Sequence, residues 1–317
     1  MKSYLLAALV AFVLSLIFCL FLIPLLRKLK AGQNILVYVK EHKKKSGTPT
    51  MGGLAFVTAA IVAGLVFMKK VDRATLLTVV ISLAYMAVGL LDDFLKRKHK
   101  ENLGLKAWQK FTFQALIALF AGLFCYRNGL TKIYFPFSDA SADIGFWSIP
   151  LGAFVFLAAV NAVNLTDGLD GLASGVSVPF FLALGVIILL EGESSAQATL
   201  CFALVGALLA YLVFNTPPAS VFMGDTGSLA LGGFAACIAV FTGNALYLAV
   251  IGFMFALSVI SVILQVIYYK ATGGKRIFLM SPLHHHFQKK GRSESKISYV
   301  YFLVTLLLGT VCVLCLL

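Results

Sequence analysis

The segment NAVNLTDGLDGL, residues 161–172, separates two almost wholly apolar runs, Trp147–Val160 and Ser177–Leu190, and indicates two membrane helices joined by a very polar link. Its amide and acid side chains recur every third residue beside two glycines: Asn161, Asn164, Asp167 and Asp170. Such groups at the end of a membrane segment are costly unless they bind something. A polar turn with Asx helix caps would need only one or two of them. We therefore interpret the segment as a functional site rather than a connecting turn.

The composition indicates that the whole chain lies in a bilayer. Of its 317 residues, 60% are hydrophobic and 12% are charged, whereas soluble domains average about 25% charged residues. A spanning helix needs roughly 17–25 residues. Ten apolar runs approach or reach that length: Tyr4–Leu26, Met51–Met68, Ala74–Leu91, Phe111–Tyr126, Trp147–Val163, Ala173–Leu190, Ala196–Val213, Ser228–Thr242, Ala245–Tyr269 and Ile297–Leu317. We predict an all-α, polytopic membrane protein with about ten transmembrane helices, in which residues 1–317 form a single integral membrane catalytic domain.

The distribution of positive charge predicts the orientation. The net charge of +13 would suggest a nucleic-acid partner in a soluble protein. If the N-terminus lies outside, however, 20 of the 26 Lys and Arg residues fall in the inner loops 27–45, 96–110 and 270–296. This split follows the positive-inside rule. It predicts that both termini lie outside and that residues 161–172 face the cytoplasm, and it requires no nucleic acid.

The outer segment Thr131–Pro150 has a different pattern. Apolar residues alternate through Ile133, Phe135 and Phe137, and apolar residues return at Ile144 and Phe146 after a polar turn. This period of two predicts a small β-hairpin on the outer surface. We assign it no chemistry.

Acidic residues also gather at the inner ends of other spans. Asp92 and Asp93 close the third span, where adjacent acids oppose the helix dipole. Neighbouring basic residues leave a solvated charge cluster as the alternative. Asp225 lies between Gly224 and Gly227 at the start of the eighth span, where it could simply cap the helix. We interpret all three acids as functional.

The first inner loop runs from the basic residues Lys43–Lys45 into the turn Ser46–Gly53. Basic residues and free N–H groups at a helix start suit an anion such as phosphate. A positive-inside anchor followed by an ordinary helix start explains the same residues equally well. The sequence leaves both interpretations open.

The last inner loop contains three consecutive histidines, His284–His286. Helical zinc pairs require i, i+4 spacing, and no cysteine or acid lies near in sequence. The six cysteines all lie in or beside apolar runs, so we interpret them as packing residues without disulfides. Beside Lys and Arg, the histidines fit better as donors to an anionic ligand.

Together, the inner loops carry carboxylates, amides and cationic donors, while the outer links carry almost none. Carboxylates without nearby thiolates suit Mg²⁺, which takes one or two carboxylates together with substrate phosphates. Mg²⁺ with Lys and His donors is typical of phosphoryl transfer. The residues alone therefore predict a membrane enzyme that handles phosphates at the cytoplasmic face.

Four motifs closely resemble the phospho-N-acetylmuramoyl-pentapeptide transferase family, a branch of the polyprenyl-phosphate N-acetylhexosamine-1-phosphate transferases. They are GLLDDF at 89–94, NAVNLTDGLDGL at 161–172, NTPPASVFMGDTGS at 215–228 and PLHHHF at 282–287. The resemblance runs the full length, with ten spans and both termini outside. The aspartate motifs are common to the superfamily, whereas PLHHHF and the TPTMGG turn at 48–53 are typical of the muramoyl-pentapeptide branch.

The resemblance implies a multi-pass enzyme of the bacterial plasma (inner) membrane with a cytoplasmic active site. It would transfer phospho-MurNAc-pentapeptide from UDP-MurNAc-pentapeptide to undecaprenyl phosphate, with Mg²⁺ as cofactor, giving lipid I and UMP for peptidoglycan synthesis. Membrane lipid would surround it, and a homodimer is left open.

The same resemblance implies roles for individual residues. Asp225 would be the Mg²⁺ ligand, and Asp92 and Asp93 would act on the lipid phosphate. The other implied substrate-binding or catalytic residues are Lys43, Thr48, Lys96, Asn161, Asn164, Asp167, Asp170, Asn215, Phe222, Gln265, His284, His285 and His286. One departure is Gln109, where the family pattern has lysine. It leaves open whether Lys106 or Lys110 contacts phosphate.

Three other functions compete with this interpretation. A cation-coupled transporter would also carry intramembrane acids, but these acids lie at span ends on one face, without an internal repeat. A scaffold protein would not need five acids at one membrane face. A sister transferase using UDP-GlcNAc is the nearest alternative, and the triple histidine disfavours it by resemblance.

Overall fold

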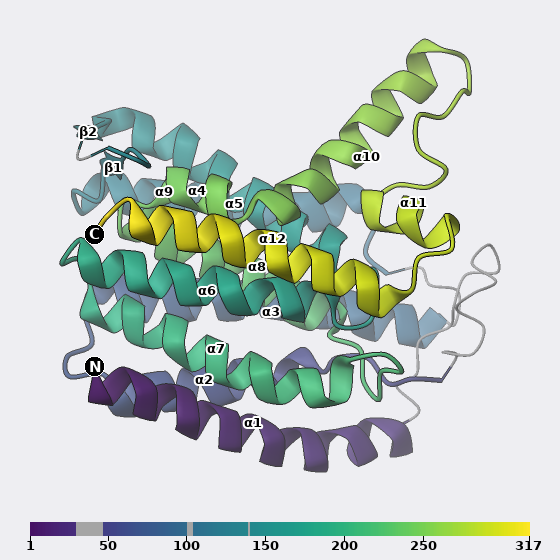
Figure 1. Ribbon diagram of the computed structural model, residues 1–317, viewed down its shortest axis with the longest axis horizontal. Coiled ribbons are helices and arrows are strands. Elements are labelled where there is room, and N and C mark those ends of the chain that lie inside the picture. Colours follow the sequence, from purple (N-terminus) through teal and green to yellow (C-terminus); the bar gives the residue numbers. More distant parts are fainter. Residues whose placement is uncertain (30–46, 100–103, 139) are drawn as a thin grey trace.

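The computed structural model describes residues 1–29, 47–99, 104–138 and 140–317, and Lys43 lies outside them. The described chain is almost entirely helical (Figure 1), which confirms the predicted all-α class. The elements, in order, are α1 (Lys2–Lys28), α2 (Gly53–Phe67), α3 (Arg73–His99), α4 (Ala107–Arg127), β1 (Lys132–Tyr134), β2 (Ser141–Asp143), η2 (Gly145–Trp147), α5 (Ser148–Thr166), α6 (Leu172–Leu190), α7 (Ser195–Asn215), α8 (Gly224–Phe241), α9 (Ala245–Ile251), α10 (Phe253–Ala271), α11 (Leu283–Lys289) and α12 (Glu294–Leu314).

The predicted spans correspond to helices, with one difference. Among the described residues, nine helices are long and apolar enough to cross a membrane, and α2 is a shorter apolar helix. The chain is therefore a multi-pass membrane protein. The predicted run Ala245–Tyr269 is broken at Gly252 into α9 and α10, because glycine tolerates the change of helix direction. Beyond this break α10 leaves the bundle (Figure 1).

The centre of the bundle is formed by α6, α7 and α8 (Figure 1). In α6 and α8, 83% of the spanning window is buried, against 28% in α1, α4, α10 and α12. Helices that are apolar on all sides are buried in this way. The outer helices instead leave one apolar face uncovered, as expected for helices in contact with lipid.

Small residues set the close approaches between helices. A side chain at Gly206 of α7 would overlap the Ala8 carbonyl of α1, and one at Gly232 of α8 would overlap Val160 of α5. Lipid tails are as apolar as Leu, so membrane helices associate through close packing of this kind rather than through a hydrophobic driving force.

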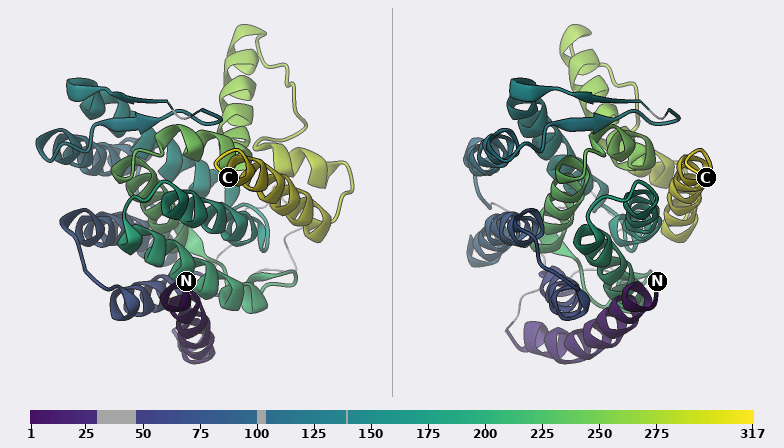
Figure 2. Two further views of the ribbon diagram at one scale, coloured as in Figure 1. Left: turned by 60° about the vertical axis from the view of Figure 1, so that its left-hand side comes forward. Right: turned by 90° about the vertical axis from the view of Figure 1, so that its left-hand side faces the viewer.

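The predicted hairpin is present and marks one end of the molecule. Strands β1 and β2 are antiparallel, with Lys132 opposite Asp143 and Tyr134 opposite Ser141. The second strand ends before Ile144, earlier than the sequence pattern predicts, because the chain turns into η2 at Gly145, whose φ is +49°. The hairpin and both termini lie at the same end of the bundle (Figures 1 and 2).

Candidate active site

The double-aspartate motif of α3 meets the start of α8 at a glycine. A side chain at Gly89 would overlap the backbone carbonyl of Asp225. This close approach brings Asp92 and Asp93 to the first turn of α8. At the other side of the contact, Gly224 has a φ of +70°, which favours glycine.

Asp93 is the residue that caps α8. Its carboxylate accepts hydrogen bonds from Asp225 N at 3.2 Å, from Thr226 N at 3.0 Å and from Thr226 Oγ1 at 2.7 Å. An acid at a helix N-terminus satisfies free N–H groups and is favoured by the dipole. Asp93 is 4% exposed, so its contacts favour a positioning role. The prediction that it acts on the lipid phosphate stays a prediction.

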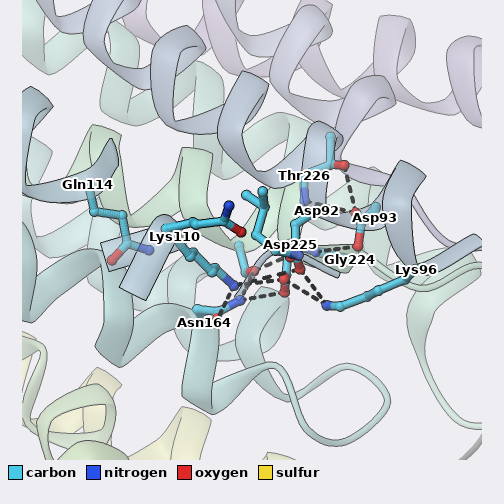
Figure 3. Close-up of polar contacts among 12 residues, drawn as sticks. Asp92, Asp93, Lys96, Lys110, Gln114, Asn164, Gly224, Asp225 and Thr226 are labelled. Carbon is cyan, nitrogen blue, oxygen red and sulfur yellow. Dashed lines mark hydrogen bonds and ion pairs between the residues drawn. The ribbon is translucent and has the colours of Figure 1, made fainter. Parts of the chain in front are cut away.

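Asp225 does not cap the helix, as the alternative interpretation had it, but points into a polar cluster (Figure 3). Its Oδ2 lies 2.8 Å from Lys96 Nζ and 2.7 Å from Lys110 Nζ. Its Oδ1 accepts a hydrogen bond from Asn164 Nδ2 at 2.7 Å. Three helices, α3, α4 and α5, therefore each supply one donor to the same carboxylate.

Asp92 shares the cluster through Lys96. The two side chains form an ion pair at 2.7 Å, and Lys110 Nζ lies 4.0 Å from the same Asp92 oxygen. The other oxygen accepts a hydrogen bond from Leu105 N at 2.7 Å. We refer to Asp92, Lys96, Lys110, Asn164 and Asp225 as the lysine–aspartate cluster.

The two lysines near Gln109, Lys106 and Lys110, differ in their distance from the site. Lys110 belongs to the lysine–aspartate cluster, whereas Lys106 is exposed at the start of α4. There Lys106 N donates to Gln109 Oε1 at 3.0 Å, so Gln109 closes the helix N-terminus. The lysine within reach of a ligand at Asp225 is Lys110.

The TPTMGG turn contacts the segment that precedes Asp225. Phe222 N donates to Pro49 O at 2.8 Å, Gly52 N donates to Phe222 O at 2.9 Å, and Gly53 N donates to Met223 O at 3.1 Å. A side chain at Gly53 would overlap Gly227. The turn therefore fixes the segment that leads into α8, and it places the half-buried Thr48 beside it.

The loop between α5 and α6, TDGLDG at 166–171, holds two acids with different surroundings. Asp170 is 4% exposed, and its Oδ2 accepts a hydrogen bond from Ala219 N at 3.0 Å. Asp167 is half-buried. Burial and the neighbouring carboxylates of Asp225, Asp93 and Asp170 raise the pKa of Asp167 well above its usual range. Asp170 thus connects two loops, whereas the raised pKa of Asp167 favours its protonated form.

Three predicted substrate ligands use their amides within the protein. Asn161 Nδ2 donates to Gln114 Oε1 at 2.9 Å. Asn215 donates to Val221 O at 3.0 Å and accepts from Ser174 Oγ at 2.7 Å. Gln265 accepts from Ile277 N and Phe278 N and donates to Phe278 O. These contacts connect elements of the protein to one another. Direct contact with a substrate remains a prediction for all three residues.

The histidines lie next to the TDGLDG loop. A Cβ atom added at Gly168 would lie 2.5 Å from His284 Nε2 and 2.9 Å from His285 Nε2. His284 is fully buried, and neither ring nitrogen has a hydrogen-bond partner among the described residues. Burial, and secondarily His285, lower the pKa of His284 well below its usual range. His284 is therefore neutral at pH 7.

Two residues that sequence reasoning missed hold these elements in place. Gln114 of α4 is 1% exposed and binds Asn161 of α5. Glu294, in the first turn of α12, accepts a hydrogen bond from Asp170 N at 3.1 Å. Gln114 lies one helical turn after Lys110, on the same face, which is the only signal that could have indicated it.

The donor set fits Mg²⁺. The cluster offers the hard carboxylate oxygens of Asp225 and Asp92. Burial, and then the neighbouring carboxylates of Asp225 and Asp93, raise the pKa of Asp167. No group of three or more His, Cys, Asp or Glu side chains suited to a metal ion is present in the described ranges. Mg²⁺ needs no such group, because it usually keeps water and takes one or two carboxylates together with substrate phosphates.

Two family models match segments of this chain that contain site residues. Glycosyl transferase family 4 matches residues 75–243, more than half of the chain. The phospho-N-acetylmuramoyl-pentapeptide-transferase signature 1 matches residues 45–57, which include the TPTMGG turn.

Three curated relatives that match along almost the whole chain are phospho-N-acetylmuramoyl-pentapeptide-transferases. The one from Listeria monocytogenes serotype 4b (strain CLIP80459) is 45% identical over 298 residues, covering 92% of either chain. The one from Clostridium novyi is 43% identical over 305 residues, covering 95% of this chain and 93% of the relative. The one from Thermoanaerobacter sp. (strain X514) is 44% identical over 310 residues, covering 97% and 96%. This chain therefore belongs to the phospho-N-acetylmuramoyl-pentapeptide-transferase family.

Proposed function

We propose that this protein transfers phospho-MurNAc-pentapeptide from UDP-MurNAc-pentapeptide to undecaprenyl phosphate, giving lipid I and UMP, with Mg²⁺ as cofactor. The observation that carries the proposal is the carboxylate of Asp225, shared by Lys96 and Lys110. The proposed reaction brings two negatively charged phosphate groups together. Ammonium groups at this position would offset their mutual repulsion.

The proposed location is the cytoplasmic face of the bacterial plasma membrane. The helices α1, α3 and α5 all run from the end that holds the termini and the hairpin toward the opposite end (Figure 1). The cluster residues Lys96 and Asn164 lie near the ends of α3 and α5, hence at that opposite end. The inner loops at this end hold most of the Lys and Arg residues, as the positive-inside rule requires. A nucleotide sugar made in the cytoplasm would reach this end.

Each residue of the cluster has a task in the proposed reaction. Lys96 and Lys110 would neutralise and position the reacting phosphates, and Asn164 would orient Asp225 through the bond to Oδ1. Asp225 and Asp92 would hold Mg²⁺. When bound, the ion supplies charge neutralisation on the diphosphate. Asp92 would also orient the lipid phosphate or take its residual proton.

The test of this function is UMP release by the purified protein in detergent with Mg²⁺ and undecaprenyl phosphate. UDP-MurNAc-pentapeptide and UDP-GlcNAc are compared as donors. Lipid-dependent UMP release with the first donor alone is expected. Turnover of UDP-GlcNAc instead would identify the sister transferase, and no turnover of either would leave the transporter interpretation to be tested by ion flux.

A substitution of Asp225 tests its proposed role as a Mg²⁺ ligand. Asp225→Asn keeps the size of the side chain and removes the charge, so activity should fall by ~10²–10³-fold. Mn²⁺ binding, followed by electron paramagnetic resonance and displaced by Mg²⁺, should weaken in parallel. The exposed outer acid Glu193 provides the matched control, Glu193→Gln, which should change neither quantity. Near-normal turnover of Asp225→Asn at saturating Mg²⁺ would remove Asp225 from the site.

A further inference from the structure

The hairpin of β1 and β2 is bonded to the ends of two spanning helices. Ile144 N, just before the turn into α5, donates to Thr131 O at 2.9 Å, and Tyr134 N donates to Gly243 O, just after the end of α8, at 2.9 Å. Helices α5 and α8 have 19 and 18 residues, so each is about 27–28 Å long. This length is close to the ~30 Å thickness of the hydrocarbon core of a bilayer. The hairpin therefore lies at the boundary of that core, rather than in the water beyond it.

The hairpin also reaches the perimeter of the protein. In the end-on view (Figure 2, right), it crosses the end that holds both termini, and its turn lies at the edge of the bundle between α10 and α12. Phe135 N donates to Ala140 O at 3.0 Å, which continues the strand pairing up to this turn. Side chains near the turn are therefore close to the lipid that surrounds the bundle.

The alternation of side chains along β1 determines the direction in which each one points. Successive side chains of a strand point to opposite faces, so Ile133 and Phe135 share one face, and Lys132 and Tyr134 share the other. Ile133 is 8% exposed and lines a small cavity together with residues of α5 and α8, so its face is turned toward the helices. Phe135 points to the same side, yet it is 43% exposed, because the hairpin has passed the edge of the helices there. Its ring therefore faces the membrane and not the water.

A second aromatic residue marks the same boundary on α5. Trp147, directly before this helix, is 70% exposed, and the exposed side chains Leu151 and Phe154 follow it at helical spacing. Trp147 thus continues the uncovered apolar face of a spanning helix to its end. Tryptophan gathers at membrane–water interfaces in this way, because its ring is apolar and its N–H group is polar.

We propose that the hairpin is an interfacial anchor, in which Phe135, with the exposed Phe137 of the same turn, inserts among the lipid headgroups of the leaflet at this end, while Lys132 on the opposite face stays in water. The partner is a lipid surface, because the rings lie at the perimeter and at the depth where interfacial segments bury their apolar faces, about 5–10 Å into the boundary of headgroups and acyl chains. Interfacial anchors help to set the tilt and rotation of a spanning helix. The hairpin would act in this way on α5, which carries Asn164 near its other end.

Tryptophan fluorescence of the full chain in lipid vesicles tests this placement. The chain has two tryptophans. Trp108→Phe leaves Trp147 as the native probe of the boundary. Trp108→Phe combined with Trp147→Phe is the background for Phe135→Trp and for the matched control on the opposite face, Lys132→Trp. The vesicles contain phosphatidylcholine and phosphatidylglycerol, with or without bromine on the acyl chains close to the headgroup. Iodide, equilibrated across the vesicles by freezing and thawing, is the quencher dissolved in water.

We expect the brominated lipid to quench Phe135→Trp about as strongly as Trp147, and iodide to quench it only weakly. Lys132→Trp should show the reverse order, so the ratio of bromolipid quenching to iodide quenching should be several-fold higher in Phe135→Trp. The apparent Tm of each variant reports whether the fold is intact. Phe137→Trp, with the same expected result, provides a second position if tryptophan at 135 disturbs the fold.

Two results would overturn the proposal. Strong iodide quenching of Phe135→Trp without bromolipid quenching would place the ring in water. Protection of Phe135→Trp from both quenchers would show that protein, such as a second copy of this chain, covers the surface instead of lipid.

Discussion

Lys110 Nζ and Asp225 Oδ2 lie 2.7 Å apart, although the two residues are 115 positions apart in the chain. Lys96 Nζ lies 2.8 Å from the same oxygen. A single carboxylate oxygen thus faces two ammonium groups from two helices, α3 and α4. With Asp92, which pairs with Lys96 at 2.7 Å, the two lysines and two acids balance in charge. The two ammonium groups are nevertheless close enough together to bind one incoming phosphate.

The first prediction concerns Lys110. Lys110→Met keeps the apolar stem and removes the charge, so activity should fall by about 10²-fold, with the apparent Tm in detergent almost unchanged because Asp225 keeps Lys96 and Asn164. The measurement is lipid-dependent UMP release. Lys106→Met is the matched control, since Lys106 is exposed at the start of the same helix. Equal losses in the two variants would show that general positive charge, and not the contact with Asp225, is what matters.

The second prediction separates the adjacent acids. Asp93→Ala would leave Asp225 N, Thr226 N and Thr226 Oγ1 without their acceptor in a buried place, at a cost of about 1–3 kcal/mol for each unsatisfied group. The apparent Tm should fall clearly. Asp92→Asn can still accept from Leu105 N, so it should reduce activity with little change in Tm. Loss of activity without loss of Tm in Asp93→Ala would mean that Asp93 acts on substrate directly.

The helices were largely predictable from sequence because a spanning helix needs a long apolar run, and such runs are visible without tertiary information. The break at Gly252 was not predictable in this way, since the run Ala245–Tyr269 is apolar throughout and an isolated glycine is common in membrane helices. The start of β2 was also misplaced, because its register depends on the turn and not on the alternation.

The candidate site shows the same division. Polar residues at the inner span ends could be recognised one by one, because each is costly in a membrane. The different role of each residue could not be predicted. Asp92 and Asp93 are neighbours in sequence, yet one joins the lysine–aspartate cluster and the other caps α8. Likewise Asn161 and Asn164 lie on one helix, but only Asn164 binds Asp225. Which partner each side chain meets depends on contacts between distant helices.

The third prediction tests the orientation in the membrane. Cys315 is exposed and the other cysteines are buried, so Cys315→Ser gives a background with little labelling. In that background, Ser138→Cys should react with an impermeant thiol reagent in intact cells, and Lys290→Cys should react only after lysis. Both positions are exposed, so access differs only by the side of the membrane. The reverse result would place the lysine–aspartate cluster outside.

The fourth prediction concerns stability and pH at the opposite end of the molecule. Burial raises the pKa of Glu191 to about 7 from an ordinary value of 4.5, although Asn244 Nδ2 donates to it at 2.9 Å. Between these two values the folded protein keeps a proton that the unfolded chain releases. The stabilising contribution is therefore complete below pH 4.5 and is lost as the pH rises through about 7.

Glu191→Gln should accordingly remove that part of the pH dependence, and it should raise the apparent Tm at pH values above 7. The measurement is thermal unfolding in detergent across the pH range. The exposed neighbour Glu193 gives the matched variant, Glu193→Gln, which should retain most of the wild-type profile, because burial raises the pKa of Glu191 more than the charge of Glu193 does. A profile for Glu191→Gln that parallels the wild type would show that Glu191 ionises normally in the folded protein.

The last prediction concerns the reaction path. In one scheme an aspartate attacks the β-phosphate, expels UMP and forms a phospho-enzyme; in the other the lipid phosphate attacks directly. The contacts favour the second, because each carboxylate oxygen of Asp225 and of Asp92 already faces a donor within the protein. Asp225 binds Asn164 through Oδ1 and both lysines through Oδ2, and Asp92 binds Leu105 N and Lys96. Carboxylates held in this way are poor nucleophiles.

The lipid acceptor, by contrast, needs no activation. A phosphate monoester has a second pKa near ~6, so it is already largely dianionic at neutral pH, and it needs positioning and charge neutralisation more than a covalent relay. We therefore predict direct displacement, and the measurement omits the lipid. Enzyme, Mg²⁺ and UDP-MurNAc-pentapeptide labelled in the sugar should release no UMP above background until undecaprenyl phosphate is added. One UMP per enzyme in a rapid burst, with label retained on the protein and lost in Asp92→Asn, would establish the covalent route, because only an enzyme nucleophile can expel UMP before the acceptor is present.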